Sequence, residues 1–500
     1  MIVGSGNPLV RDWGKYRRPP RRGLPRWMWL LVALSSVAAV GVFVWLSRGS
    51  ERWRPPSGSP QFVSCTYGGY VDGWCGHVRV ASDPSKPQGQ TIALRVTVLP
   101  ATTQPAAGAL FYLEGGPGVA ATTAAVSVNA FFAQVGRTRD LVMVDQRGTG
   151  GSSRLACPDR HVDAADAGAV TGYLRECFAQ LDTDPRLYTT SVAADDLETV
   201  RLALGYGKID LYGVSYGGTL AQAYLRQYPR SLRSVVLDSG SLPAVRIYDV
   251  SARNAERALD AQLARCAAVR TCARAYPHPR RQLNELLARP PRPVSLVTGK
   301  ALLRSTDIAW MVQTLSETAE GAAIIPSAIN AAVHGDYTTL ALAYGPRTGS
   351  NLDSRARLIP YWVILCSEPW AAFDPATTAR VGTGSYLARA AIGRARLFRR
   401  ACRVVPKGFV PPTAGSLRVV PVPTLLLAGS ADPLDPVANL RGWRRLFRHG
   451  RLIVVVGAGH GTIEYPCVQR LVAGFIERAR ATRLNSACAR HVSLPPFLIG

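Results

Sequence analysis

The chain has 500 residues, of which 47% are hydrophobic and 18% are charged, with 46 Gly and 36 Pro. This composition is ample for a large core and excludes a mainly disordered chain, so we expect one large domain with an insertion, or two domains. The net charge is +26. No aromatic-interleaved basic run or zinc-finger spacing accompanies it, so nucleic-acid binding is not indicated. Two interpretations of the charge stay open: association with anionic cell-envelope polymers, or an arginine-biased composition.

The N-terminal segment has the pattern of a membrane anchor. Residues 1–26 hold seven Lys or Arg against one Asp, and residues 27–46 then run without a charge. At about 1.5 Å per residue that run reaches about 30 Å, the thickness of one hydrocarbon core. The cationic tail is expected to stay in the cytoplasm, which would place everything after Arg48 outside. Residues 47–60 are then a linker between membrane and globule.

A cleaved signal peptide is the alternative for this segment. Its apolar region would normally span about 7–15 residues and end at small residues. Here the apolar run is longer and its exit reads Val-Trp-Leu-Ser-Arg at residues 44–48. We therefore favour an uncleaved anchor, with secretion after cleavage as the alternative.

The cysteine count predicts disulfides. An exported chain with ten cysteines is expected to form bridges, although sequence alone cannot fix one pairing among the many. No C-x-x-C pair has a partner pair or nearby His ligands, so we expect no metal site. Local spacing favours five bridges: Cys65–Cys75, Cys157–Cys177, Cys266–Cys272, Cys366–Cys402 and Cys467–Cys488.

From Cys65 onward, apolar strand-like segments alternate with amphipathic helix-like ones. This order predicts an α/β fold with a mostly parallel sheet and helices on both faces. The alternation stops over residues 242–411, which are helix-like and which we interpret as an inserted helical cap above a core of residues 61–241 and 412–500. The expected strands cover residues 91–99, 110–113, 141–144, 208–212, 234–237, 424–427 and 452–456, and the expected core helices cover 192–204, 219–228 and 468–481.

The most informative stretch is Gly-Val-Ser-Tyr-Gly at residues 213–217. It lies between the strand ending near residue 212 and the helix from residue 219, which is the setting of a nucleophile elbow. A serine on such a turn projects its hydroxyl outward, and glycines on either side let strand and helix approach closely. The pattern predicts Ser215 as a catalytic nucleophile.

A serine nucleophile needs a base, and the base needs a carboxylate that orients it. In an α/β fold with a nucleophile elbow, the serine comes first in the chain, the Asp or Glu second and the His last. The strand at 424–427 is followed by Asp432, and the next strand is followed by His460 between two glycines. Both are expected at the carboxyl edge of the sheet, where α/β folds build their sites. We predict His460 as the base and Asp432 as the acid, with Asp435 and Asp238 as rivals for the acid.

Two backbone donors are expected to form the oxyanion hole. One is the N–H of Tyr216, which follows the nucleophile, and the other should come from a glycine loop after an early strand. Residues 113–118 read Leu-Glu-Gly-Gly-Pro-Gly, and Gly116 is our choice of donor. Residues 145–150, Asp-Gln-Arg-Gly-Thr-Gly, lack the ending of a phosphate-binding loop and are interpreted as an Asp–Arg turn lock beside the site.

Four motifs occur in order along the chain: Gly-Gly-Pro-Gly at 115–118, Asp-Gln-Arg-Gly-Thr-Gly at 145–150, Gly-Val-Ser-Tyr-Gly-Gly at 213–218 and Gly-His-Gly at 459–461. With them the chain resembles the α/β-hydrolase family of proline iminopeptidases and secreted tripeptidyl aminopeptidases (TAP-like proteins). The likeness extends from about Cys65 to Cys488. Its cysteine-bounded tail looks like the C-terminal segment of the tripeptidyl branch.

The resemblance implies a serine exopeptidase whose cap supplies acidic side chains that hold the substrate amine. Glu368 is the cap acid that we select for this role, against the alternative of an ordinary surface glutamate. Glu114 stands where typical proline iminopeptidases have a His before Gly-Gly-Pro-Gly. This departure favours the broader tripeptidyl-like branch over strict proline specificity.

Together these features predict a membrane-anchored extracytoplasmic serine hydrolase that acts as an aminopeptidase on short peptides through an acyl-enzyme at Ser215. No cofactor is expected. One alternative is a carboxylesterase or lipase, because the same triad attacks esters more easily than amides. The other is an inactive binding or envelope-scaffolding protein on a hydrolase fold, against which the complete set of Ser215, Asp432 and His460 argues.

Overall fold

The computed structural model describes Trp53 and residues 61–159, 162–163, 166–296, 299–344 and 358–499. The predicted tail and anchor, residues 1–46, lie outside the described residues, as does most of the predicted linker. Within the described ranges, no helix combines the length and the apolar character needed to cross a membrane.

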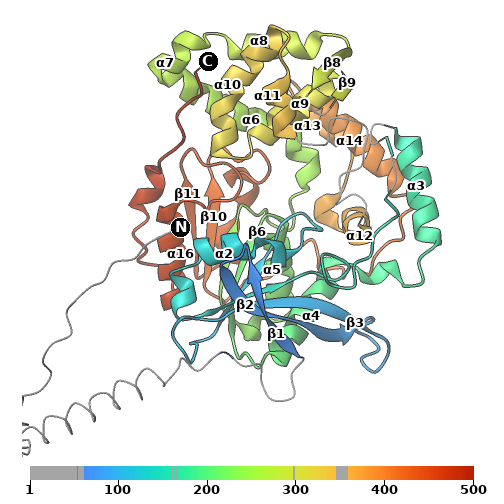
Figure 1. Ribbon diagram of the computed structural model, residues 1–500, viewed down its shortest axis with the longest axis vertical. Coiled ribbons are helices and arrows are strands. Elements are labelled where there is room, and N and C mark those ends of the chain that lie inside the picture. Colours follow the sequence, from blue (N-terminus) through green and yellow to red (C-terminus); the bar gives the residue numbers. More distant parts are fainter. Residues whose placement is uncertain are drawn as a thin grey trace, which may run out of the picture. The chain divides into compact units, whose positions relative to one another are not determined.

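A mixed sheet forms the centre of the described residues, with the order β1-β2-β3-β5-β4-β6-β7-β10-β11 (Figure 1). Strands β1, β2, β3 and β5 pair in antiparallel fashion, and from β5 to β11 every pair is parallel. The predicted α/β fold is confirmed. The strands are β1 (Phe62–Tyr67), β2 (Val71–Ala81), β3 (Thr91–Leu99), β4 (Ala109–Leu113), β5 (Asp140–Val144), β6 (Ile209–Val214), β7 (Leu232–Asp238), β10 (Thr424–Gly429) and β11 (Gly450–Val455).

The central strands are buried on both faces. Every residue of β4, β5 and β10 is buried, as a continuous apolar run predicts for a sheet covered by helices on both sides. Successive residues of β4 alternate between the two main hydrophobic clusters, with Phe111 in one and Leu110 in the other. Helices α4 (Thr190–Ala203) and α5 (Tyr216–Gln227) pack in the first cluster, and α2 (Ala125–Phe131) and α16 (Pro466–Arg478) pack in the second.

The chain leaves the sheet after β7 and returns at β10, and the cap lies between them. Most of its helices share a separate hydrophobic cluster, and the cap helices stand above the sheet in Figure 1. A hairpin, β8 (Arg292–Leu296) and β9 (Gly299–Leu303), interrupts them. The helices are α6 (Ile247–Ala268), α7 (Arg270–Ala275), α8 (Pro279–Ala288), α9 (Ser305–Leu315), α10 (Ala319–Val333), α11 (Thr338–Tyr344), α12 (Ile359–Ser367), α13 (Pro375–Val381) and α14 (Ala388–Ala401), with α3 (Ala167–Ala179) before the cap in sequence and α15 (Trp443–Leu446) after it.

The C-terminal residues fasten the core to the cap. The backbone N–H of Leu498 donates to the carbonyl of Ala323 in α10, and the hydroxyl of Tyr276 donates to the carbonyl of Leu498. The guanidinium of Arg265 lies 4.2 Å from the ring centroid of Phe497. The end of the described chain therefore packs on the cap, close to α7 in Figure 1.

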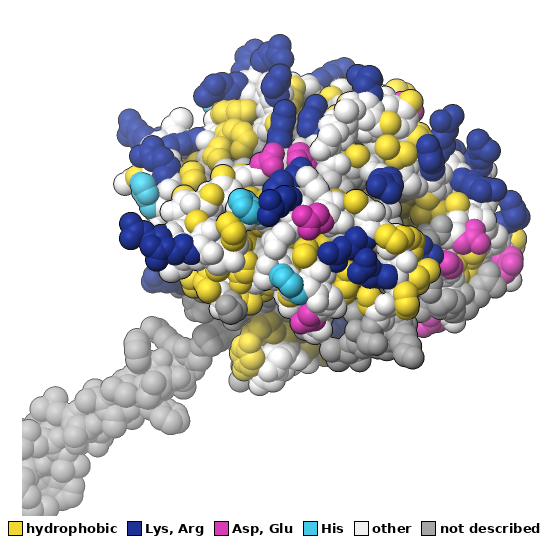
Figure 2. Space-filling model, turned by 90° about the horizontal axis from the view of Figure 1, so that it is seen from above, with side chains coloured by type: hydrophobic (Ala, Val, Ile, Leu, Met, Phe, Trp, Pro, Cys, Tyr) yellow, Lys and Arg dark blue, Asp and Glu magenta, His cyan; other side chains and the backbone are white. Residues whose placement is uncertain are grey.

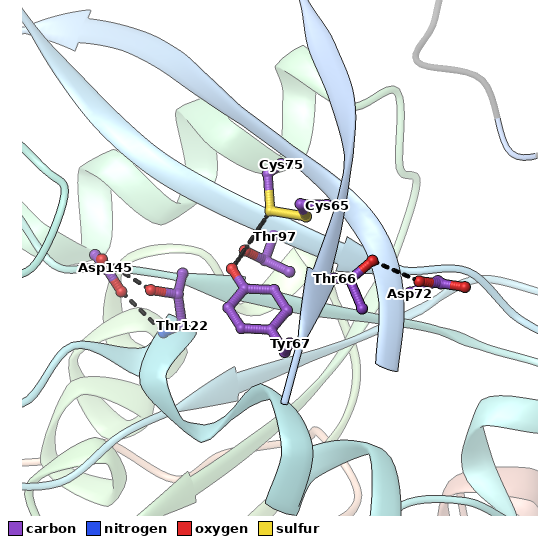
Figure 3. The surroundings of a disulfide bond; sticks show 8 residues. All are labelled: Cys65, Thr66, Tyr67, Asp72, Cys75, Thr97, Thr122 and Asp145. Carbon is purple, nitrogen blue, oxygen red and sulfur yellow. Dashed lines mark hydrogen bonds between the residues drawn. A yellow bond between two sulfur atoms is a disulfide. The ribbon is translucent and has the colours of Figure 1, made fainter. Parts of the chain in front are cut away.

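All five predicted disulfides are present. The bridge between Cys65 and Cys75 joins β1 to β2, as Figure 3 shows. Beside it, the hydroxyl of Tyr67 lies 2.6 Å from Oγ1 of Thr97, so the bridge and this hydrogen bond connect three neighbouring strands. Strands β1 and β2 are not among the predicted strands.

The loop at residues 145–150 is locked, but Asp145 and Arg147 do not pair with each other. Asp145 accepts from the backbone and hydroxyl of Thr122 at 2.9 and 3.1 Å (Figure 3). Arg147 donates to both carboxylate oxygens of Asp196 in α4, at 2.6 and 2.5 Å. Both members of this ion pair are buried, with side chains 1% and 5% exposed. The ion pair therefore ties the loop after β5 to a helix of the core.

We expect Asp196→Asn to destabilise the protein by about 3 kcal/mol, because it leaves the buried Arg147 charge without its partner. The matched control is Glu285→Gln, which removes the exposed partner of Arg281 on α8 and should cost less than about 0.5 kcal/mol. Urea denaturation of the full-length chain measures both. Equal small losses in the two variants would contradict the importance of the buried pair.

Candidate active site

Ser215 occupies a strained turn between β6 and α5. Its backbone angles are φ 55° and ψ −125°, a conformation that residues with a side chain seldom adopt. The flanking glycines are required by close backbone contacts: a Cβ at Gly213 would lie 2.3 Å from the carbonyl oxygen of Gly217, and one at Gly217 would lie 2.0 Å from that of Leu113. The turn has the geometry of the predicted nucleophile elbow.

Asp432 and His460 meet at the carboxyl edge of the sheet, after β10 and β11. The Nδ1 atom of His460 lies 3.1 and 3.0 Å from the two carboxylate oxygens of Asp432. Burial alone would lower the pKa of His460, but the neighbouring carboxylates, above all Asp432, raise it by more. In the same pair, burial raises the pKa of Asp432 but the interaction with His460 outweighs it, so the pKa of Asp432 is lowered. The carboxylate thus stabilises the imidazolium that forms when His460 accepts a proton.

The two rival carboxylates have other partners. Asp238 accepts from the hydroxyl of Tyr212 at 2.5 Å and from both the backbone and the hydroxyl of Thr462 at 2.9 Å. Asp435 accepts a hydrogen bond from the hydroxyl of Ser241. Asp432 is therefore the carboxylate that contacts His460. Asp238 instead anchors the same loop at Thr462, two residues after His460.

The loops of Ser215 and His460 are close neighbours. A Cβ on Gly461 would lie 3.8 Å from Cγ2 of Val214, so the residues next to the predicted base and nucleophile lie near each other. The N–H of Gly461 also donates to the hydroxyl of Ser239 at 2.9 Å. In the described part of the chain, no hydrogen bond joins the Ser215 hydroxyl to His460. Such bonds commonly tighten only when substrate binds.

A cap residue holds the His460 loop in place. The N–H of His460 donates to the carbonyl of Glu317, between α9 and α10, at 2.7 Å. The same carbonyl would lie 2.3 Å from a Cβ on Gly459. Gly459 is thus the residue that lets the cap approach the predicted base. Glu317 was not predicted, because no feature of the sequence identifies a backbone carbonyl for such a role.

The loop after β4 stands beside Ser215. The N–H of Gly115 donates to the Glu114 carboxylate at 2.7 Å, whereas Gly116 lines the pocket that contains Ser215. Tyr216 is the first residue of α5, so its N–H has no acceptor inside the helix. This arrangement suits Gly116 and Tyr216 as the two predicted donors and gives Glu114 the task of orienting the loop.

Glu368 is buried behind the pocket and is not one of its lining residues. Its carboxylate accepts from the backbone and hydroxyl of Thr190, each at 2.8 Å, and from the indole of Trp370 at 2.5 Å. The hydroxyl of Thr190 in turn lies 2.9 Å from that of Tyr216. These contacts give Glu368 a positioning role for Trp370 and Tyr216. Its predicted binding of a substrate amine stays a prediction.

Ser215 opens into a small pocket of about 40 Å³ between core and cap. Within the described ranges, no three His, Cys, Asp or Glu side chains converge as a metal site would require. The pocket walls were not foreseen, because they come from the start of the cap and from the segment after α12. The lining residues are Gly116, Ser215, Tyr216, Thr219, Ser241, Leu242, Pro243, Ile247, Tyr248, Trp370 and Asp435.

Comparison with known proteins agrees with the fold described above. Residues 108–287 match the family described as alpha/beta hydrolase fold, and residues 389–488 match the family described as TAP-like protein. The chain therefore has the α/β-hydrolase fold, and its residues 389–488 are similar to TAP-like proteins, so the resemblance predicted from the motifs is confirmed.

Three curated proteins illustrate the similarity. The tripeptidyl aminopeptidase of Streptomyces coelicolor is 33% identical over 186 residues, which cover 33% of this chain and 34% of that protein. Serine protease Hip1 of Mycobacterium tuberculosis is 30% identical over 207 residues, which cover 37% of this chain and 39% of that protein. The proline iminopeptidase of Lactobacillus acidophilus is 33% identical over 136 residues, which cover 26% of this chain and 35% of that protein. The chain thus spans little more than a third of the length of the curated relatives it matches.

We expect Gly459→Ala to lower kcat by about 10²-fold, because the new methyl group displaces the Glu317 carbonyl and with it His460. Hydrolysis of a nitrophenyl ester by the full-length variant measures the effect. The control is Gly393→Ala in α14, where a Cβ meets nothing within 4 Å. An unchanged kcat in a folded Gly459→Ala variant would show that the cap contact does not position the base.

Proposed function

We propose that this protein is a serine hydrolase that acts as an aminopeptidase on short peptides. The observation that carries the proposal is the nucleophile elbow at Ser215, standing beside the hydrogen-bonded pair of His460 and Asp432. The names of the similar proteins, which include tripeptidyl aminopeptidases, a serine protease and proline iminopeptidases, support a peptide substrate.

The mechanism follows from the placement of these groups. The Oγ of Ser215 attacks the substrate carbonyl while His460 accepts the hydroxyl proton, and Asp432 keeps the imidazole oriented and stabilises its charge. The N–H groups of Gly116 and Tyr216 donate to the oxyanion that develops on the carbonyl oxygen. His460 then gives its proton to the leaving amine, which departs and leaves an acyl-enzyme. Water, activated by the same histidine, releases the acid and restores Ser215.

The N-terminus of α5 adds to the stabilisation of the oxyanion. The helix starts directly after Ser215, and its aligned peptide dipoles place partial positive charge where the negative oxygen forms. Tyr216, which supplies one donor, is held through its side-chain hydroxyl, which lies 2.9 Å from the hydroxyl of Thr190 and accepts from the side-chain amide of Gln146 at 3.0 Å. The donor is therefore fixed before substrate arrives.

The test compares alanyl and trialanyl anilides, with free and acetylated N-termini, against short and long acyl esters. We expect the full-length protein to cleave free-amine anilides and to lose this activity when the amine is blocked. Ser215→Ala should lower turnover by about 10⁴- to 10⁶-fold while the protein stays folded. Near-normal turnover by the folded variant would remove Ser215 from the mechanism. Turnover confined to esters would instead identify a carboxylesterase.

We also propose that residues 27–46 anchor the protein in the cell membrane, with the hydrolase outside the cytoplasm. The basic tail before the apolar run and the five disulfides of the described residues support this arrangement. Lys and Arg side chains are spread over the face in Figure 2, with fewer Asp and Glu among them. This surface supports a further association with anionic envelope polymers.

The anchor is tested in intact cells. We expect protease added outside to degrade the hydrolase, and the full-length chain to stay with the membrane after an alkaline carbonate wash. A variant with four Arg substituted within residues 27–46 should lose both properties. Recovery of a soluble form whose N-terminus begins after residue 46 would show that the segment is a cleaved signal peptide.

A further inference from the structure

One carboxylate in the pocket has no task in the mechanism above. Asp435 lines the same pocket as Ser215, and its surroundings there are mainly apolar or aromatic: Leu242, Pro243, Ile247, Tyr248 and Trp370. Only 6% of Asp435 is exposed. It is therefore a buried acidic group that faces the space in which a substrate must lie.

Asp435 has only neutral hydrogen-bond donors. The hydroxyl of Ser241 donates to its carboxylate, and Asn439 donates to Ser241 at 2.8 Å and also stabilises the charge of Asp435. Among the described residues, no Lys or Arg forms an ion pair with it. Two cationic groups lie near the pocket: His460 directs its Nδ1 to Asp432, and Arg394 lies over the ring of Tyr248. A charge buried in this way is stabilised most by a cation that enters the pocket.

The carboxylate is available to such a cation at neutral pH. Burial raises the pKa of Asp435 to about 6; His460 opposes the increase and Asp432 adds to it. At pH 7 the group is thus mostly ionised. An incoming ammonium would favour the ionised form further.

The walls of the pocket suit an ammonium group. Trp370 lines it, and aromatic faces attract cations. The indole of Trp370 is held by its bond to Glu368. Tyr248 also lines the pocket, but its ring stacks on Phe373 at 4.4 Å between ring centroids and has the guanidinium of Arg394 4.8 Å from its centroid, so it acts as a wall and not as a cation-binding face. One carboxylate between fixed aromatic walls forms a site for a small cation.

The size of the pocket limits where that cation can lie along a peptide. A volume of about 40 Å³ holds roughly three water-sized groups, which is enough for one small residue. In a peptide whose first carbonyl is attacked, the terminal ammonium is two bonds from the reacting carbon. In a tripeptide acyl group it would lie about 7 Å further away, beyond this pocket.

We propose that Asp435 binds the N-terminal ammonium of a peptide whose first carbonyl is attacked by Ser215, so that the enzyme releases single N-terminal residues with small apolar side chains. This assignment rests on the proposed aminopeptidase function. It makes Asp435, rather than an acid deep in the cap, the residue that selects a free amine.

The test is Asp435→Asn in the full-length protein, because asparagine keeps the shape and an acceptor for Ser241. We expect kcat/KM for alanyl anilide to fall by about 100-fold, mainly through KM, since a buried charge pair is lost. Hydrolysis of a propionyl ester, which lacks an amine, should change by less than about 3-fold. The preference for alanyl over acetyl-alanyl anilide should disappear.

The matched control is Ser241→Ala, which removes a hydrogen bond from Asp435 but leaves its charge in the pocket. It should retain the preference for the free amine. The pH profile of ester hydrolysis is recorded for each variant, because Asp432, Asp435 and Glu317 all act on the pKa of His460. An Asp435→Asn variant that loses ester and amine substrates equally, with a shifted profile, would show that Asp435 acts through His460 and would overturn the proposal.

Two further outcomes separate this proposal from the proposed function. If the wild-type protein cleaves free-amine anilides but Asp435→Asn keeps that preference, or if trialanyl anilide is strongly preferred to alanyl anilide, only the Asp435 assignment fails. If the wild-type protein cleaves only esters, in a manner that requires Ser215, the aminopeptidase function fails and the assignment fails with it.

Discussion

The site depends on a set of backbone contacts that leave no room for side chains. Gly213 and Gly217 bring β6, α5 and the end of β4 so close together that a Cβ at either glycine would overlap a carbonyl group. This packing holds Ser215 at a positive φ that the residue would not adopt by itself. The same approach brings the loop of Gly116 beside the nucleophile. The proposed nucleophile and its proposed oxyanion donors are thus fixed by one local constraint, and the stability of the surrounding sheet maintains the strain.

The histidine side of the site is held differently, by contacts between distant segments. Asp238 at the end of β7 binds Thr462, Ser239 binds Gly461, and Glu317 of the cap binds the N–H of His460 itself. Three consecutive residues after β11 are therefore fastened to two separate parts of the chain. Since one of those parts is the cap, a displacement of the cap would be transmitted to the base. The cap thus holds the proposed base in place and also forms a wall of the pocket.

The residues that could be predicted from sequence are those with a local signal. Ser215 lies between glycines at a strand-to-helix turn, and Asp432 and His460 each follow a buried apolar strand. The disulfides were predictable because four of the five close loops of 6 to 21 residues. Strands β1 and β2 were missed, since their mixed polar, Gly-containing sequences lack the continuous apolar pattern of the central strands. The choice between Asp432 and Asp435 could not be made from sequence, because both carboxylates follow the same strand. Only the structure shows that the side chain of Asp432 contacts His460, whereas that of Asp435 contacts Ser241.

Roles that depend on partners far away in sequence had no such signal. Glu368 was selected because it is an acid in the cap, yet its partner Thr190 lies 178 residues earlier, and no local pattern reports that contact. The burial of Glu368 and of Asp435 has different consequences for the same chemical group. Glu368 is satisfied by three donors from the protein, so its carboxyl group holds Thr190 and Trp370 in place. Asp435 faces the pocket with neutral donors only, so part of its electrostatic interaction remains for a ligand. The two buried acids near Ser215 thus have different proposed roles: Glu368 positions Trp370 in the pocket wall, and Asp435 provides negative charge inside the pocket.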